Sequence, residues 1–142
     1  MLDMKAYSKL LAGASWMGEY GDPDTDDWLF LRKHSAYHLL RHDCLGLPEV
    51  PPPATPVEGR AEWTCPKVLF TTSTRDDRVH PGHARKMVRA LQEEAKERAP
   101  TVYYWENVEG GHAGAADNKQ RAHMWALTYI FVGKMLGLQG SW

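Results

Sequence analysis

Long hydrophobic runs and an excess of charge of one sign are both missing from this sequence. No apolar segment among its 142 residues is long enough to cross a bilayer, so we expect no membrane-embedded part. The net charge is −1 and the basic residues form no stripe with interleaved aromatics, which argues against a nucleic-acid partner. The first residues contain neither a basic region nor an apolar core, so no signal peptide is visible and a cytoplasmic location is favoured.

Cysteine is also scarce, and both cysteines flank a proline-rich segment. Residues 43–66 contain Cys44, Cys65 and six of the nine prolines, and they show neither helical nor strand periodicity. We expect this segment to be a loop or an insertion within the domain. Two free thiols are the expected state of the cysteines, although an oxidising compartment would allow a disulfide that closes the loop.

A strand, a helix and a second strand are predicted in the second half of the chain. Residues 67–72 follow Pro66 and are rich in apolar and β-branched side chains, as in a buried parallel strand. Residues 81–98 begin with a proline, which the first turn of a helix tolerates, and continue with apolar residues at helical spacing. Residues 101–105 are all β-branched or aromatic. This βαβ pattern predicts parallel strands whose following loops meet at one edge of a sheet.

Those two loops carry residue types of a hydrolytic triad. Asp76 follows the first strand, and His112 lies in the glycine-rich residues 110–114 after the second. A triad needs a carboxylate that holds the imidazole tautomer and a histidine that reaches the cleft. In α/β-hydrolases the nucleophile comes first along the chain, then the acid, then the base. Asp76 and His112 are therefore in the order of acid and base, and we expect a hydrogen bond between them.

No convincing nucleophile precedes these two residues. The serines of the chain are Ser8, Ser15, Ser35, Ser73 and Ser141. Only Ser15 has glycines nearby, but the spacing from Gly13 to Gly18 is one residue too long for the G-x-S-x-G elbow, and no clear strand precedes it. We therefore expect the attacking group to lie outside this chain.

These motifs resemble the end of the catalytic domain of the prolyl oligopeptidase family of serine peptidases. The resemblance rests on residues 11–21, 35–38, 70–87 and 110–114. It implies that residues 1–142 are a single partial domain, the C-terminal part of an α/β-hydrolase fold with an incomplete, mostly parallel sheet and flanking helices. A complete sheet of this kind has about eight strands. Beyond the two strands predicted above, only a possible remnant near residues 1–7 is found.

The resemblance also implies roles for individual residues. Asp76 would be the triad acid and His112 the base. Substrate binding would fall to Trp16, Tyr20, Arg78 and Val79. The arginine would hydrogen-bond the substrate backbone, and the other three would form a pocket for proline. The substrate is implied to be a short peptide, and the partners to be the missing N-terminal portion of the catalytic domain and a propeller domain. No metal or organic cofactor is implied.

Two physical arguments accompany these assignments. Alternate side chains of an extended loop point to the same side, so Asp76 and Arg78 can share a cleft while Asp77 turns away. A flat indole such as that of Trp16 offers a proline ring a large, rigid contact area. The alternative is that Trp16 and Tyr20 are loop aromatics packed on the core.

Two more helices are predicted outside the βαβ unit. Residues 26–40 form the first, after a turn at residues 22–24. The second follows Asp117, which can cap it, with Gln120 three residues on. One apolar face of this last helix is predicted to cover the sheet, and it consists of Trp125, Tyr129, Val132 and Leu136.

Two other functional classes remain open. His34, His38 and His42 recur every four residues and could line one helical face as a metal site. The chain could also be a non-enzymatic remnant of a hydrolase, because an Asp and His pair without its serine cannot form an acyl-enzyme. We expect the complete form to be a serine peptidase and this chain alone to be inactive.

Overall fold

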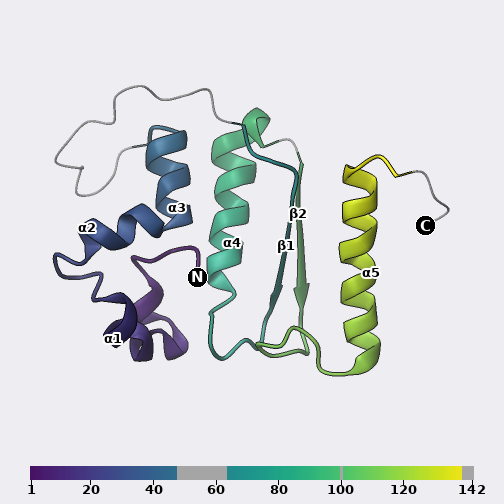
Figure 1. The fold of residues 1–142 in the computed structure, drawn as a ribbon, viewed down its shortest axis with the longest axis horizontal. Coiled ribbons are helices and arrows are strands. Elements are labelled where there is room, and N and C mark those ends of the chain that lie inside the picture. The colour runs from purple at the N-terminus through teal and green to yellow at the C-terminus, as the bar shows by residue number, and fades with distance from the viewer. Residues whose placement is uncertain (48–63, 100, 139–142) are drawn as a thin grey trace.

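The centre of the computed structural model, which describes residues 1–47, 64–99 and 101–138, is a parallel pair of strands. Strand β1 (Val68–Ser73) pairs with β2 (Val102–Asn107), and the two strands end level with one another. Both predicted strands are therefore confirmed, together with their parallel direction. Figure 1 shows that the loops after β1 and β2 leave the sheet at the same end.

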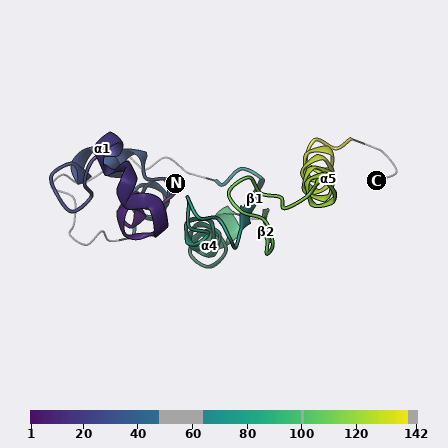
Figure 2. The same cartoon turned by 90° about the horizontal axis from the view of Figure 1, so that it is seen from below.

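The connection between the strands is helical and covers one face of the sheet. Helix α4 (Gly82–Arg89) continues as a π-helical segment (Ala90–Ala95) and a 3₁₀ turn (Lys96–Arg98), which confirms the helix predicted after Pro81. Its inner side packs against β1 and β2, with Ala90, Leu91 and Ala95 at the centre of the larger hydrophobic core. Figure 2 shows α4 on one side of the strand pair and α5 on the other.

The N-terminal region consists of short helical pieces. They are two 3₁₀ segments (Tyr7–Lys9, Leu11–Trp16), α1 (Met17–Tyr20), α2 (Trp28–Leu31), a 3₁₀ turn (Arg32–His34), α3 (Ala36–His38) and a π-helical segment (Leu39–Cys44). The strand remnant suggested for residues 1–7 is wrong. Asp3 Oδ1 accepts hydrogen bonds from the backbone N–H groups of Lys5 and Ala6, at 3.0 and 3.1 Å, and this turns the chain into the first helical segment.

The continuous helix predicted over residues 26–40 is also wrong, because it is interrupted at Ser35. The Ser35 backbone is extended, and its fully buried hydroxyl accepts a hydrogen bond from the backbone N–H of Met4 at 3.0 Å. The backbone N–H of Tyr37 donates to Leu2 O at 2.9 Å. The N–H of Tyr37, which a continuous helix would bond to a carbonyl of its own preceding turn, is therefore bonded to the N-terminal segment instead.

The last helix, α5 (Asn118–Met135), begins as predicted but presents a different face to the sheet. Asp117 Oδ1 accepts a hydrogen bond from Gln120 N at 2.8 Å, which confirms the cap. The predicted inner face points outward instead, since the side chains of Trp125, Tyr129, Val132 and Leu136 are all at least 43% exposed. Contact with β2 is made from another side of the helix, where the ring centroids of Phe131 and Tyr103 are 5.8 Å apart.

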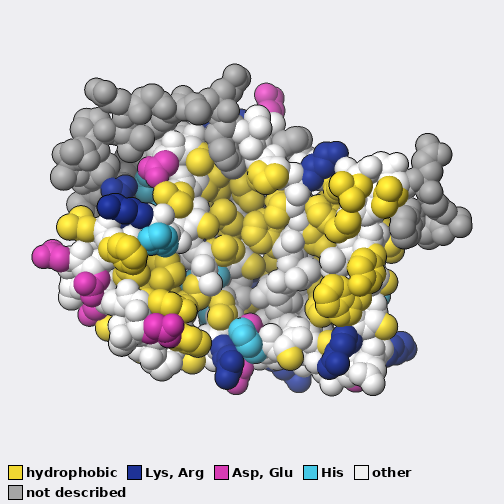
Figure 3. All heavy atoms as spheres, viewed as in Figure 1, with side chains coloured by type: hydrophobic (Ala, Val, Ile, Leu, Met, Phe, Trp, Pro, Cys, Tyr) yellow, Lys and Arg dark blue, Asp and Glu magenta, His cyan; other side chains and the backbone are white. Residues whose placement is uncertain are grey.

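Apolar surface is therefore left open on both the sheet and α5. Figure 3 shows hydrophobic side chains gathered over the strands and the last helix. A groove of about 250 Å³ lies between them, lined on the helix by Leu127, Ile130 and Phe131 and on the sheet by Leu69 and Tyr103. Within the described ranges, no helix combines the length and the apolar character needed to cross a membrane.

Most of the proline-rich segment lies outside the described residues, which end at residue 47 and resume at residue 64. Cys44 and Cys65, near its two ends, are free thiols, as expected. Both pack beside the larger hydrophobic core. Burial raises the pKa of both thiols.

Candidate active site

The loop after β1 is a tight turn organised by the carboxylate of Asp76. Asp76 Oδ1 accepts hydrogen bonds from the backbone N–H groups of Arg78 and Val79, both at 2.9 Å. The alternation expected of an extended loop is therefore wrong here, and Arg78 does not share the cavity that Asp76 lines. Asp77 is exposed and also lies outside that cavity. Asp76 is thus the carboxylate that the turn directs inward.

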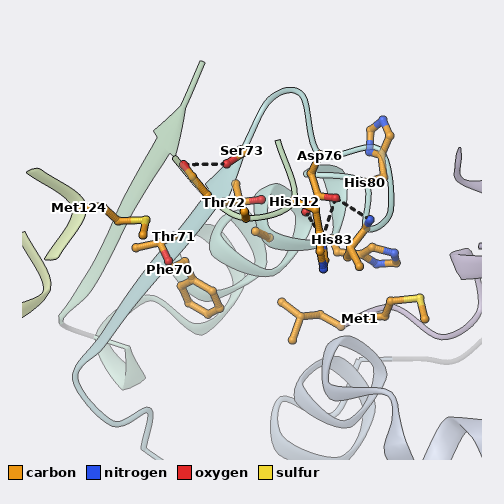
Figure 4. A pocket seen from close by; sticks show the side chains of 15 residues that line it. Met1, Phe70, Thr71, Thr72, Ser73, Asp76, His80, His83, His112 and Met124 are labelled. Atoms are coloured by element: carbon orange, nitrogen blue, oxygen red, sulfur yellow. Dashed lines mark hydrogen bonds and ion pairs between the residues drawn. The ribbon is translucent and has the colours of Figure 1, made fainter. Parts of the chain in front are cut away.

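His112, in the loop after β2, meets this carboxylate. Its Nδ1 lies 2.9 Å from Asp76 Oδ1 and 3.0 Å from Oδ2, so the expected hydrogen bond is present (Figure 4). An ionised carboxylate can only accept, so Nδ1 carries the proton and Nε2 of the neutral ring is left as an acceptor. In the part of the chain that the structure describes, no hydrogen bond is made to Nε2. The side chain of His112 is 45% exposed and that of Asp76 only 11%, so a further group can reach the ring.

The environment of Asp76 keeps it ionised. Burial raises the pKa of this carboxyl, but the backbone N–H groups of Val79 and Arg78 and the ring of His112 outweigh it, so that the pKa lies below its ordinary value. A carboxylate in this state holds the tautomer of the histidine and stabilises the imidazolium when the ring takes up a proton.

Glycines give the His112 loop its shape. A Cβ placed on Gly110 would lie 2.5 Å from the carbonyl oxygen of Gly114, so the two ends of the loop touch through their backbones. Gly114 has a φ of +84°, a conformation that other residues adopt only with strain. The loop therefore folds back on itself and presents His112 at its tip.

A cavity of about 430 Å³ adjoins the pair. Its lining includes Asp76 and His112 together with Val79, His80, His83 and Met124. Figure 4 shows that the labelled side chains come from β1, from the two loops, from the start of α4, from α5 at Met124 and from the N-terminal segment at Met1. The cavity is thus a meeting point of segments that are far apart in the sequence.

The four predicted substrate-binding residues are separated by the structure. Val79 lines the cavity, whereas Arg78 is exposed outside it. Trp16 and Tyr20 stack on each other, with ring centroids 5.9 Å apart and an angle of 6° between the planes. Neither ring lines the cavity, and Trp16 packs against the smaller core. Their segments, at and before α1, lie at the same end of the molecule as the two loops (Figure 1).

None of the described serines is hydrogen-bonded to His112. Ser15 is exposed and donates to Ala12 O at 2.6 Å. Ser73 lines the cavity but is only 2% exposed and bonds to Gly114 O at 3.4 Å. Ser141 lies outside the described residues.

A second group of serine, histidine and aspartate lies in the N-terminal region, but it cannot act as a triad. Ser35 Oγ is 2.7 Å from His38 Nδ1, and Asp3 Oδ1 is 3.8 Å from the same nitrogen. In a triad the hydroxyl and the carboxylate bind opposite nitrogens of the ring. Burial lowers the pKa of His38 to about 4, and Ser35 is fully buried. This group therefore serves to pack the N-terminal segment.

The histidines proposed as a metal site do not form a ligand set. His38 Nδ1 is bonded to Ser35, and His42 Nδ1 lies 2.8 Å from Leu47 O. The His34 ring packs on Phe30 at 4.7 Å, before the helix break. Over the described residues, no group of three His, Cys, Asp or Glu side chains is placed to hold an ion. The metal hypothesis gains no support from this geometry.

Comparisons with known proteins agree with the fold and the motifs. A sequence model of the prolyl oligopeptidase family matches residues 49–139. An uncharacterized peptidase of Sinorhizobium fredii is 38% identical over 137 residues, which make up 96% of this chain and 16% of that protein. A prolyl oligopeptidase of Omphalotus olearius is 34% identical over 146 residues, 99% of this chain and 17% of that protein.

A solved structure supports the same relationship. The post-proline cleaving enzyme of Rickettsia typhi is 30% identical, superposes with a TM-score of 0.72, and is matched over 96% of this chain and 17% of its own. This chain therefore spans only 16 to 17% of the length of these three proteins. The sequence match, the parallel βαβ unit and the shared fold together establish that the chain belongs to the prolyl oligopeptidase family and forms part of its α/β-hydrolase catalytic domain.

Proposed function

We propose that this chain supplies the acid and the base of a serine peptidase whose nucleophile lies elsewhere. The observation that carries the proposal is the contact of His112 Nδ1 with both oxygens of Asp76, at 2.9 and 3.0 Å, beside an open cavity. The hydrogen bond fixes which nitrogen bears the proton, and the exposed ring leaves the other nitrogen for a reacting partner.

In the complete enzyme, His112 Nε2 takes the proton of a serine hydroxyl while the serine oxygen forms a bond to the substrate carbonyl carbon. The carbon–nitrogen bond then breaks as Nε2 returns the proton to the leaving amine. Water repeats the sequence on the acyl-enzyme, giving its proton to Nε2 and releasing the carboxylic acid and the free serine. Asp76 remains ionised throughout and stabilises the imidazolium.

The proposed substrates are short peptides, and the proposed contacts follow the family resemblance. Val79 has direct support because it lines the cavity. The guanidinium of Arg78 would hydrogen-bond the substrate backbone from its exposed position two residues after Asp76. The stacked rings of Trp16 and Tyr20 would accept a proline once the rest of the domain completes the cleft.

A second candidate is an inactive remnant of such an enzyme. The observation that favours it is that no serine of residues 1–47, 64–99 and 101–138 is hydrogen-bonded to His112. Both candidates predict that the chain alone has no peptidase activity, because the acyl-enzyme needs the missing nucleophile. They differ in whether Asp76 and His112 still work when a nucleophile is supplied.

A chimera tests this difference. The segment of the Rickettsia typhi enzyme that matches this chain would be replaced by residues 1–142, and hydrolysis of a peptidyl-proline substrate would be measured. We expect turnover that His112→Ala removes. A folded chimera without turnover would favour the inactive remnant, and equal turnover with and without His112 would refute the proposed base.

Labelling with a fluorophosphonate probe checks the nucleophile separately. We expect the chimera to be labelled on a serine of the host portion and the isolated chain to remain unlabelled. Labelling of the isolated chain that disappears on Ser15→Ala would show that the nucleophile lies in this chain after all.

A further inference from the structure

The last residue of β2, Asn107, has a buried side chain whose carboxamide is fully used. It is 6% exposed. Its Oδ1 accepts hydrogen bonds from the backbone N–H groups of Glu109 and Gly110, at 3.0 and 3.1 Å. Its Nδ2 donates to Gly114 O at 2.5 Å and to Gln120 Oε1 at 2.9 Å. Two acceptor sites and two donor hydrogens are the capacity of one such side chain.

These bonds close the loop that carries His112. Gly110 precedes the histidine by two residues and Gly114 follows it by two, so the carboxamide holds both sides of the loop tip. Because the backbones of Gly110 and Gly114 approach closely, one short side chain that carries both a donor and an acceptor can bond to both. Aspartate has the same shape but no donor, and a hydroxyl group has too few sites.

Asn107 also reaches beyond this loop in two directions. Its backbone carbonyl accepts a hydrogen bond from Thr74 N at 2.8 Å, two residues before Asp76. Its partner Gln120 accepts from Ala116 N at 3.0 Å through the same Oε1, at the start of α5. One residue thereby links the acid loop, the base loop and the last helix.

We propose that Asn107 is a positioning residue that holds His112 Nδ1 against Asp76. The catalytic meaning of this role rests on the proposed function, in which His112 is the base. The hydrogen bonds by which Asn107 orients the loop do not depend on it. Asn107 touches no reacting atom, so its effect must appear in the state of the His112 ring rather than in substrate binding.

The test reads the ring nitrogens of His112 by nuclear magnetic resonance in the ¹⁵N-histidine-labelled chain, with His112→Ala used to assign the signal among the seven histidines. In the unmodified chain we expect a single tautomer protonated on Nδ1 and a downfield Hδ1 resonance. In Asn107→Asp we expect loss of that resonance and a mixture of tautomers, because the carboxylate repels Gly114 O. The matched control is Asn118→Asp, the same chemical change at an exposed position in the first turn of α5.

A folded Asn107→Asp chain with the tautomer and Hδ1 signal of the unmodified chain would overturn the proposal. If Asn107→Asp does not fold, Gln120→Leu decides, since it keeps Asn107 but removes the acceptor that orients its amide. We expect a smaller shift toward the mixed tautomer, and an unchanged ring would again overturn the proposal. This measurement needs no catalysis, so a chimera that stays active in His112→Ala would refute the proposed function while the role of Asn107 in the loop would stand.

Discussion

The carboxylate of Glu106, on β2, hydrogen-bonds to the residue after β1 and to α4, next to the loops that carry Asp76 and His112. We predict how much the chain loses in stability when this charge is removed. Glu106 Oε1 accepts hydrogen bonds from Thr74 Oγ1 and from Arg85 Nη2, both at 2.5 Å. Its Oε2 accepts from Arg85 Nε at 3.0 Å and from the Tyr104 hydroxyl. The Glu106 side chain is 15% exposed. The hydrogen bond from Arg85 is the main cause that lowers the pKa of Glu106 from 4.5 to about 2, against the opposing effect of burial.

The size of the effect follows from this pKa. A change from 4.5 to about 2 corresponds to roughly 3 kcal/mol of folding free energy. Water at the half-exposed Arg85 screens the pair, so we expect about 1 to 2 kcal/mol. Because the pKa is lower in the folded state, this stabilisation is complete above pH 4.5 and is lost as the pH falls toward 2.

Urea unfolding of the chain and of Glu106→Gln, at several pH values between 7 and the acid range, measures this contribution. Glu106→Gln keeps the shape of the side chain and removes its charge, so we expect it to unfold more readily at pH 7 and to approach the unmodified chain toward pH 2. The control is Glu93→Gln, which breaks the exposed pair with Arg89 and should change little. A difference between Glu106→Gln and the unmodified chain that is the same at pH 3 as at pH 7 would refute the argument.

Three further predictions concern the site, the last helix and the open surface. In the chimera, Asp76→Asn should lower kcat by about 10⁴-fold, as in the serine-protease triad. Asp77→Asn should have little effect on kcat, and the opposite ranking in steady-state kinetics would contradict the turn geometry. Asp117→Ala should destabilise the chain by about 1 kcal/mol in urea unfolding through loss of the cap, whereas Asn118→Ala should not. In analytical ultracentrifugation the isolated chain should self-associate through the exposed apolar face of α5, and Tyr129→Lys should weaken this association. A chain that stays monomeric at high concentration would contradict this prediction.

The βαβ unit could be predicted because its signals are local. The β-branched and aromatic runs, the proline at residue 81 and the spacing of apolar residues all act within a few residues of the chain. The break at Ser35 could not be predicted in this way, since it depends on Met4 and Leu2, which are more than thirty residues earlier. The facing side of α5 was ambiguous because apolar residues occur around much of the helix, and Leu127, Ile130 and Phe131 form a second apolar side.

The acid and the base of the candidate site could be predicted from the sequence, but the hydrogen bonds that hold their loops in place could not. The order of Asp76 and His112 after successive strands was enough to bring them together. The expectation that alternate side chains of an extended loop share a cleft was wrong, because the Asp76 carboxylate accepts hydrogen bonds from the backbone of its own loop and forms a turn. Aspartate often forms such turns. Asn107 was missed, although an asparagine that ends a strand before a glycine-rich loop is a recognisable turn signal.

The closeness of acid and base along the chain has a consequence for the order of folding. Asp76 and His112 are 36 residues apart, and the strands, the crossover and the loops that hold them all lie in one continuous stretch. Contacts of short sequence separation close at a small entropic cost and tend to form early. We therefore expect the aspartate–histidine pair to form during the early folding of this stretch. A nucleophile from a distant part of the protein would then meet a base that already has its orientation and tautomer.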